Sequence, residues 1–157
     1  MAQGDGEEVA AVQRIENLAN SIRELHDAII RTTGGVLGEK SASLLSAVAR
    51  PFYVVDNKFV YPTYLEMAAA MFHGLICGHV FADGSKRTGT MIAAAIIELD
   101  EELGHTATPE EIKRMEVIAL QAALPGGMPV QEIIDRFREI FPPVGRTDND
   151  GEEDIVP

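Results

Sequence analysis

A strongly apolar stretch over residues 65–97 constrains the fold of this chain more than any other feature, because after Glu66 charged residues interrupt it only at 79–87. Thr63 and Glu66 have the spacing of a capping box, which predicts a helix that begins there and continues to about residue 78. That helix is apolar almost all the way round and must therefore be buried. A second helix is predicted over residues 85–103. The sequence thus predicts two central helices that flank one charged loop.

Weaker patterns predict the helices that surround this pair. Apolar residues advance by three or four positions over residues 9–31, which is typical of an amphipathic helix, and Gly34-Gly35 ends it. Short helices are expected over residues 41–48 and 130–140. Another capping box, with Pro at the first helical position, opens a helix over residues 108–123.

Residues 52–60 are the one stretch with the character of a strand. Aromatic and β-branched residues flank Asp56-Asn57, which favours a tight turn. An isolated hairpin is marginally stable, so we expect it to lie against the helices. The predicted fold class is therefore all-α: a helical bundle whose central helices flank the loop, with one small β-hairpin flap.

Length and charge limit the domain organisation and the partners. A chain of 157 residues favours one domain, which we place at residues 9–142. Residues 1–8 and 143–157 are acidic and have little to bury, so we expect them to be disordered. A net charge of −12 argues against nucleic-acid binding. The N-terminus lacks a hydrophobic signal core and no apolar stretch is long enough for a membrane span, so a cytoplasmic protein is expected.

The loop has the parts of a phosphoryl-transfer site. Gly84 precedes a helix whose unpaired N–H groups favour an anion, and Lys86 and Arg87 occupy the end of the helix where cations are normally unfavourable. A bound polyanion would reverse that preference. Asp83 offers a hard oxygen ligand for Mg²⁺, and His79 can exchange a proton near neutral pH. The alternative is a solvated connection in which His79 has a structural role.

The segment His79-Val80-Phe81-Ala82-Asp83-Gly84-Ser85-Lys86-Arg87 resembles the signature of the Fic/Doc superfamily, and its Lys-Arg-Thr ending resembles the Doc (death-on-curing) branch. Further similarity covers about residues 20–140. It includes the pieces Leu25-His26-Asp27, Gly34-Gly35, Leu44-Leu45, Ala49-Arg50-Pro51, Tyr61-Pro62-Thr63 and Met67-Ala68-Ala69.

The resemblance implies a role for each loop residue. His79 matches the general base that deprotonates a target hydroxyl, Phe81 the core anchor of the loop and Asp83 the magnesium ligand. Gly84 and Ser85 match the anion-binding nest. Lys86 and Arg87 match the residues that hold the nucleotide phosphates, and with His79 they form the catalytic set. The hairpin matches the flap against which the family docks a target segment by strand addition.

The implied function is that of a Doc-like toxin that transfers phosphate from ATP, with Mg²⁺, to a Ser or Thr of a protein, for example a translation factor such as elongation factor Tu. Two positions depart from the family pattern. Ser85 replaces the usual Asn, which puts nucleotide affinity in doubt. Thr90 stands where the adenylylating branch carries an Arg, which favours the kinase. Transfer of AMP, or a catalytically impaired binding module, are the alternatives.

Two further expectations concern control and metals. The family's inhibitory helix is matched only in its first part by residues 106–110, so control in trans by an antitoxin partner is expected. His73, Cys77 and His79 could form a transition-metal site, but no set of four ligands is apparent. His26, at helical spacing from apolar residues, is expected to be structural.

Overall fold

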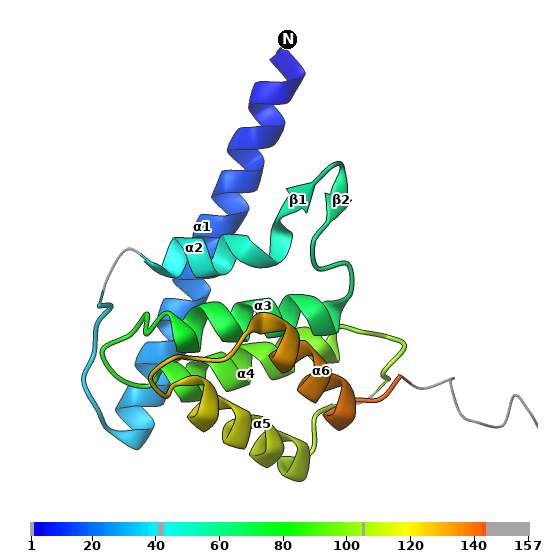
Figure 1. Ribbon diagram of the computed structural model, residues 1–157. Coiled ribbons are helices and arrows are strands. Elements are labelled where there is room, and N and C mark those ends of the chain that lie inside the picture. Colours follow the sequence, from blue (N-terminus) through cyan, green and yellow to red (C-terminus); the bar gives the residue numbers. More distant parts are fainter. Residues whose placement is uncertain (1, 41–42, 105, 144–157) are drawn as a thin grey trace, which may run out of the picture.

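The structure is a computed structural model that describes residues 2–40, 43–104 and 106–143. Within these ranges the chain is mostly helical and has one small antiparallel sheet, which confirms the predicted all-α fold class (Figure 1). The helices are α1 (Ala2–Thr33), α2 (Ser43–Ala49), the 3₁₀-helix η1 (Arg50–Phe52), α3 (Tyr64–Cys77), α4 (Ser85–Glu98), α5 (Pro109–Ala122) and α6 (Val130–Ile140). The strands are β1 (Val54–Val55) and β2 (Lys58–Phe59).

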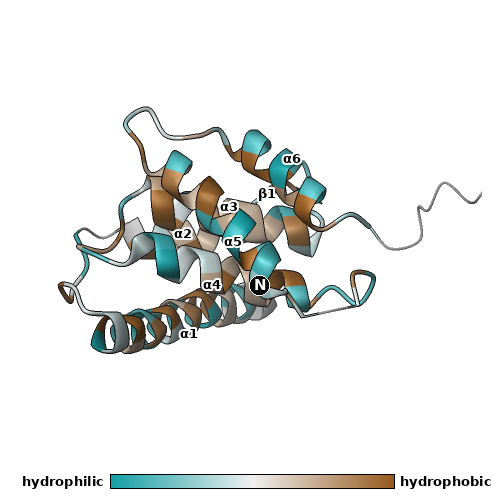
Figure 2. Ribbon diagram, turned by 90° about the horizontal axis from the view of Figure 1, so that it is seen from below, coloured by the Kyte–Doolittle hydropathy of each residue, from teal (hydrophilic) through white to brown (hydrophobic). Residues whose placement is uncertain are grey.

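Helices α3 and α4 form the centre of the bundle, as the apolar stretch predicts. α3 contacts α4 most extensively and also packs against α2, α5, α6 and η1. The outer helices α1, α5 and α6 each carry both hydrophilic and hydrophobic residues, as expected for helices with one buried side (Figure 2). At the core, Phe72 of α3 meets Phe137 of α6 edge to face, with ring centroids 5.0 Å apart.

The core has two parts, and the charged loop belongs to one of them. The larger cluster joins α3 and α4 to α5 and α6. The smaller cluster joins α1, α2 and α3, and it includes Val80 and Phe81 of the loop, which are 0% and 3% exposed. The loop is therefore fixed to the core on the side of α1.

Capping decides where the helices begin. Thr63 accepts a hydrogen bond from the backbone N–H of Glu66 at 3.2 Å, whereas the Glu66 carboxylate pairs with Arg138 of α6 at 2.9 Å. Only half of the predicted capping box is thus formed at α3. At α5 the box is complete, because Thr108 and Glu111 bond each other's backbone N–H groups.

Two boundaries differ clearly from the prediction. α1 begins at Ala2, so residues 2–8, for which we expected disorder, are helical. α4 ends at Glu98, because the Asp100 carboxylate accepts a bond from the N–H of Glu102 and starts a turn. The predicted tail lies outside the described residues from position 144 onward. Among the described residues, no helix combines the length and hydrophobicity needed to cross a membrane.

The hairpin forms where predicted but stands away from the helices (Figure 1). Asp56 and Asn57 both have positive φ, 51° and 61°, which is the geometry of a two-residue type I′ turn. Val54 pairs with Phe59, and all four strand residues are exposed. The expectation that the hairpin lies against the helices was therefore wrong.

Candidate functional site

The charged loop is a tight connection held by neighbouring backbone. α3 ends at Cys77, and His79 then adopts a left-handed conformation with φ of 46°. The N–H of Lys40 donates to the carbonyl of Val80 at 2.8 Å, and the N–H of Ala82 donates to the carbonyl of Gly38 at 3.0 Å. The segment after α1 thus pairs with the loop like a short antiparallel strand.

His26 of α1 supports the loop from the core side. Its ring is 1% exposed and stacks on Phe81, with centroids 3.8 Å apart and planes 8° apart. Its Nε2 lies 2.6 Å from the carbonyl oxygen of Asp83, which can only accept, so Nε2 donates. His26 is structural, as predicted, but its contact with the loop could not be predicted, because 57 residues separate it from Asp83 in the sequence.

Replacing His26 separates these two contributions. His26→Phe keeps the stacking but leaves the Asp83 carbonyl without its donor, and should reduce the free energy of unfolding by about 1–3 kcal/mol. His26→Ala also loses the packing on Phe81 and should cost about 3–5 kcal/mol. Urea unfolding measures both changes. Wild-type stability in His26→Ala would show that the ring does not support the loop.

Asp83 lies against the glycine pair that ends α1. One carboxylate oxygen accepts from the N–H of Gly84 at 2.8 Å. The other lies where Gly35 approaches: a Cβ on Gly35 would sit 2.4 Å from it. From the sequence we predicted only that Gly35 ends the helix. Its contact with the Asp83 carboxylate cannot be recognised from the residues next to it in the sequence. Among the described residues, no group of three His, Cys, Asp or Glu side chains could hold a metal alone.

This close approach predicts different effects at two glycines. Gly35 and Gly38 have φ of 125° and 112°, so Ala at either position is strained and should cost about 1–2 kcal/mol. A Cβ at Gly38 meets nothing within 4 Å. If the site binds ATP with Mg²⁺, as the resemblance implies, Gly35→Ala should therefore also displace Asp83 and weaken Mg²⁺-dependent ATP binding at least tenfold, whereas Gly38→Ala should not. Calorimetry with and without Mg²⁺ tests this, and equal affinities in the two variants would contradict it.

The first turn of α4 presents backbone N–H groups and two cations. Its N-cap is Gly84, with φ of 78°, and no side chain caps the helix. Lys86 and Arg87 are exposed; Lys86 has no bonding partner among the described residues, and Arg87 donates from Nη1 to Thr33 at 2.7 Å. This arrangement suits an anion.

Ser85 is used differently from what the resemblance implies. Its hydroxyl accepts from the N–H of Phe81 at 3.2 Å and lies 3.5 Å from the Phe81 carbonyl. The side chain therefore closes the loop on itself. Its backbone N–H is the part of Ser85 that remains for an anion.

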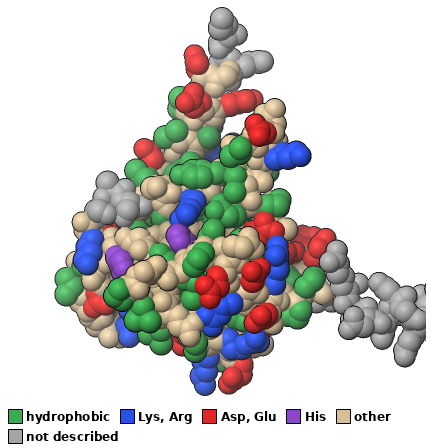
Figure 3. All heavy atoms as spheres, viewed as in Figure 1, with side chains coloured by type: hydrophobic (Ala, Val, Ile, Leu, Met, Phe, Trp, Pro, Cys, Tyr) green, Lys and Arg blue, Asp and Glu red, His purple; other side chains and the backbone are tan. Residues whose placement is uncertain are grey.

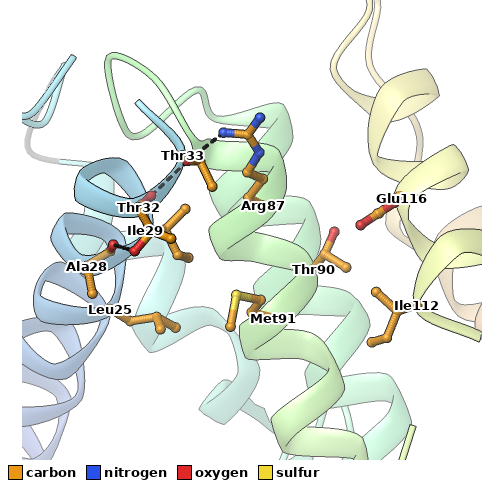
Figure 4. A pocket seen from close by; sticks show the side chains of 10 residues that line it. All are labelled: Leu25, Ala28, Ile29, Thr32, Thr33, Arg87, Thr90, Met91, Ile112 and Glu116. Carbon is orange, nitrogen blue, oxygen red and sulfur yellow. Dashed lines mark hydrogen bonds between the residues drawn. The ribbon is translucent and has the colours of Figure 1, made fainter. Parts of the chain in front are cut away.

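A cavity of about 450 Å³ adjoins Arg87 between α1, α4 and α5 (Figure 4). Figure 4 shows Arg87 turned toward Thr33 at the rim, with Thr90 one turn further along α4. The Thr90 hydroxyl is buried and has no hydrogen-bond partner in the described structure. The cavity is lined by Leu25, Ala28, Ile29, Thr32, Thr33, Arg87, Thr90, Met91, Ile112 and Glu116. Its walls are mostly apolar and its rim is polar, which is typical of a small-molecule site.

His79 lies on a different hollow, of about 470 Å³, between α3 and the connection from α5 to α6. Its side chain is exposed and has no partner among the described residues. His73 and Cys77 also line this hollow, but with His79 they do not form a metal cluster in the part of the chain described here. Burial lowers the pKa of His73, and Arg50 lowers it further.

Comparison with known proteins gives one match. Residues 17–97 match the model of the Fic/DOC family. The matched stretch includes most of α1, the hairpin, the loop and nearly all of α4. Comparisons with curated proteins and with solved structures gave no match.

Proposed function

The chain belongs to the Fic/DOC family, whose members are typically transferases, and from this premise we propose that it transfers the terminal phosphate of ATP to a Ser or Thr hydroxyl of a protein. The site residues fit such a substrate. The uncapped first turn of α4 and the side chains of Lys86 and Arg87 would hold the phosphates. One carboxylate oxygen of Asp83 has no hydrogen-bond partner among the described residues and would bind Mg²⁺ together with phosphate oxygens.

The observation that carries the choice of phosphate over AMP is the position of the apolar cavity. It is lined by Arg87 and not by His79, whereas the hollow at His79 is not lined by Arg87. A nucleoside in the cavity would direct its phosphates past Arg87 toward the loop, so the terminal phosphate would lie nearest to His79. Thr90 keeps this cavity open. The longer Arg that the adenylylating branch carries at this position would occupy it.

In the proposed reaction, His79 accepts the proton of the target hydroxyl as the hydroxyl oxygen bonds to the terminal phosphorus. The bond from that phosphorus to the bridging oxygen breaks, and ADP leaves with the electron pair. Lys86 and Arg87 offset the negative charge that moves onto the leaving phosphate. Mg²⁺ supplies further charge neutralisation on the phosphate oxygens. The family match gives the transferase class; these individual roles are part of the proposal.

Labelled ATP separates the alternatives. The protein is incubated with Mg²⁺, purified elongation factor Tu or a bacterial lysate, and ATP labelled at either the γ or the α phosphate. Protein labelled only from the γ position supports phosphate transfer; label from the α position shows AMP transfer instead. The Ser85 hydroxyl, bonded within the loop, favours a third possibility, a binding module. Calorimetry with ATP and Mg²⁺ tests it, because a nest impaired by Ser85 would show no binding of the nucleotide.

The biological setting that we propose is a cytoplasmic toxin restrained by an antitoxin protein. The Lys86-Arg87-Thr88 ending of the Doc branch and the incomplete inhibitory pattern at residues 106–110 support it. Induced expression in bacteria, with and without the product of the neighbouring gene, tests it. Arrested growth that the neighbour relieves is the expected result, and normal growth in both cultures contradicts it.

A further inference from the structure

A groove follows α3 from the base of the hairpin to His79. Two hollows of about 430 and 470 Å³ adjoin each other and share His73 and Cys77 as lining residues. Arg50 and Tyr53 line the first hollow, and His79 lines the second. A bound segment of chain could therefore contact η1 at one end and the candidate base at the other.

Arg50 is held in this groove without a counter-ion among the described residues. Its Nη1 donates to Nδ1 of His73 at 2.6 Å, and the His73 ring also interacts with the backbone of Met128. Burial and Arg50 both lower the pKa of His73, so its ring stays neutral and can accept this bond. None of the ion pairs among the described residues involves Arg50. A partly buried guanidinium that is fixed and unpaired favours an incoming anion.

The surroundings of the groove suit a polypeptide. Large hydrophobic side chains are exposed on the hairpin and the segments beside it, and Figure 3 shows hydrophobic side chains gathered over α2 and the hairpin on the face where histidines are visible. They are Phe52, Tyr53, Val54, Val55, Phe59, Val60 and Tyr64. Such a surface contacts the apolar side chains of a bound segment, while Arg50 supplies the charge.

We propose that Arg50 is a specificity determinant that binds an acidic side chain of the protein substrate, about three residues from the hydroxyl that is modified. The spacing follows from the helix. The four residues from His73, which holds Arg50, to the end of α3 at Cys77 span about 6 Å, and Gly78 and His79 extend the path to on the order of 10 Å. An extended segment covers that distance in about three residues. The net charge of −12 repels acidic segments from the protein in general. Arg50 therefore selects for a carboxylate at the one substrate position that contacts it. The inference rests on the proposed transfer to a protein hydroxyl.

The test uses peptide libraries with a fixed central Thr, in which one flanking position at a time is Glu, Gln or Lys. Transfer is measured with labelled ATP, and binding is measured separately by selecting displayed peptides on immobilised protein. Wild type should prefer Glu over Gln about tenfold at a position about three residues from the Thr, as expected for one charged hydrogen bond. Arg50→Gln should lose the preference, and Arg50→Glu should prefer Lys. Arg136→Gln is the matched control, because Arg136 bonds Gln121 of α5. This variant should keep the preference for Glu over Gln.

The two measurements keep the outcomes distinct. An acidic preference in binding without any transfer rejects the proposed phosphotransfer and supports the role of Arg50. Transfer with the same flanking preference in wild type and Arg50→Gln overturns the role of Arg50 and leaves the phosphotransfer standing. If wild type enriches no acidic position in either assay, the inference is also wrong. Melting temperatures of the variants show whether each has kept the fold.

Discussion

Arg87→Ala is expected to weaken ATP binding by about tenfold to a hundredfold and to abolish phosphate transfer. The loss corresponds to charged hydrogen bonds worth about 1.5–3 kcal/mol. Arg87 is exposed on the first turn of α4, and its bond to Thr33 fixes the guanidinium beside both the uncapped N–H groups and the cavity. No other cation among the described residues lines that cavity.

Two further variants at this site sharpen the result. Arg87→Lys keeps the charge but not the planar fork, so we expect intermediate affinity and less transfer. Thr33→Val removes the partner of Arg87 without changing a charge and should raise the Kd for ATP severalfold at unchanged stability. Calorimetry measures the affinities. Wild-type affinity in Arg87→Ala would place the nucleotide elsewhere on the molecule.

His79→Asn should lower the rate of transfer by about 10²- to 10⁴-fold, the contribution of a positioned general base, while ATP binds as in wild type. Asn is chosen because it tolerates the left-handed conformation that His79 adopts, so the loop keeps its path. The ring of His79 has no partner among the described residues, and its removal breaks no hydrogen bond there.

The control is Arg136→Gln, whose parent residue bonds Gln121 of α5 and lines neither hollow of the groove. It should keep most of the transfer activity. Single-turnover labelling from the γ position of ATP measures the chemical step, and equilibrium binding is measured in parallel. Full activity of His79→Asn on a labelled protein would rule out His79 as the base.

Local chemistry made most of the fold predictable. The apolar stretch predicts the central pair α3 and α4, and the Thr108 capping box and the Asp56-Asn57 turn place α5 and the hairpin within a residue or two. The start of α1 was missed, because Gly4, Asp5 and Gly6 lower the helical propensity that a prediction relies on. The hairpin's outward position depends on tertiary contacts that its own residues do not encode.

The candidate site was predictable in its loop and not in its supports. The loop residues are recognisable in the sequence because they are charged and lie within an apolar stretch. His26, Thr33 and Gly35 act on Asp83 and Arg87 across about fifty residues of sequence, and each has an ordinary helical explanation when only its neighbours are considered. The cavity beside Thr90 depends on how α1 and α5 pack against α4, which no local pattern specifies.

The attachment of the loop to α1 has a consequence for protein engineering. Because the ring of His26, the hydroxyl of Thr33 and the backbone of Gly35 come from α1 and the turn that follows it, a signature segment transplanted between two helices of another bundle would lack these supports. Grafting this chemistry onto a new protein requires the second half of α1 and the chain through Lys40 as well. The smallest unit that could be transferred consists of two segments that are separate in the sequence, so inserting the loop segment alone is not sufficient.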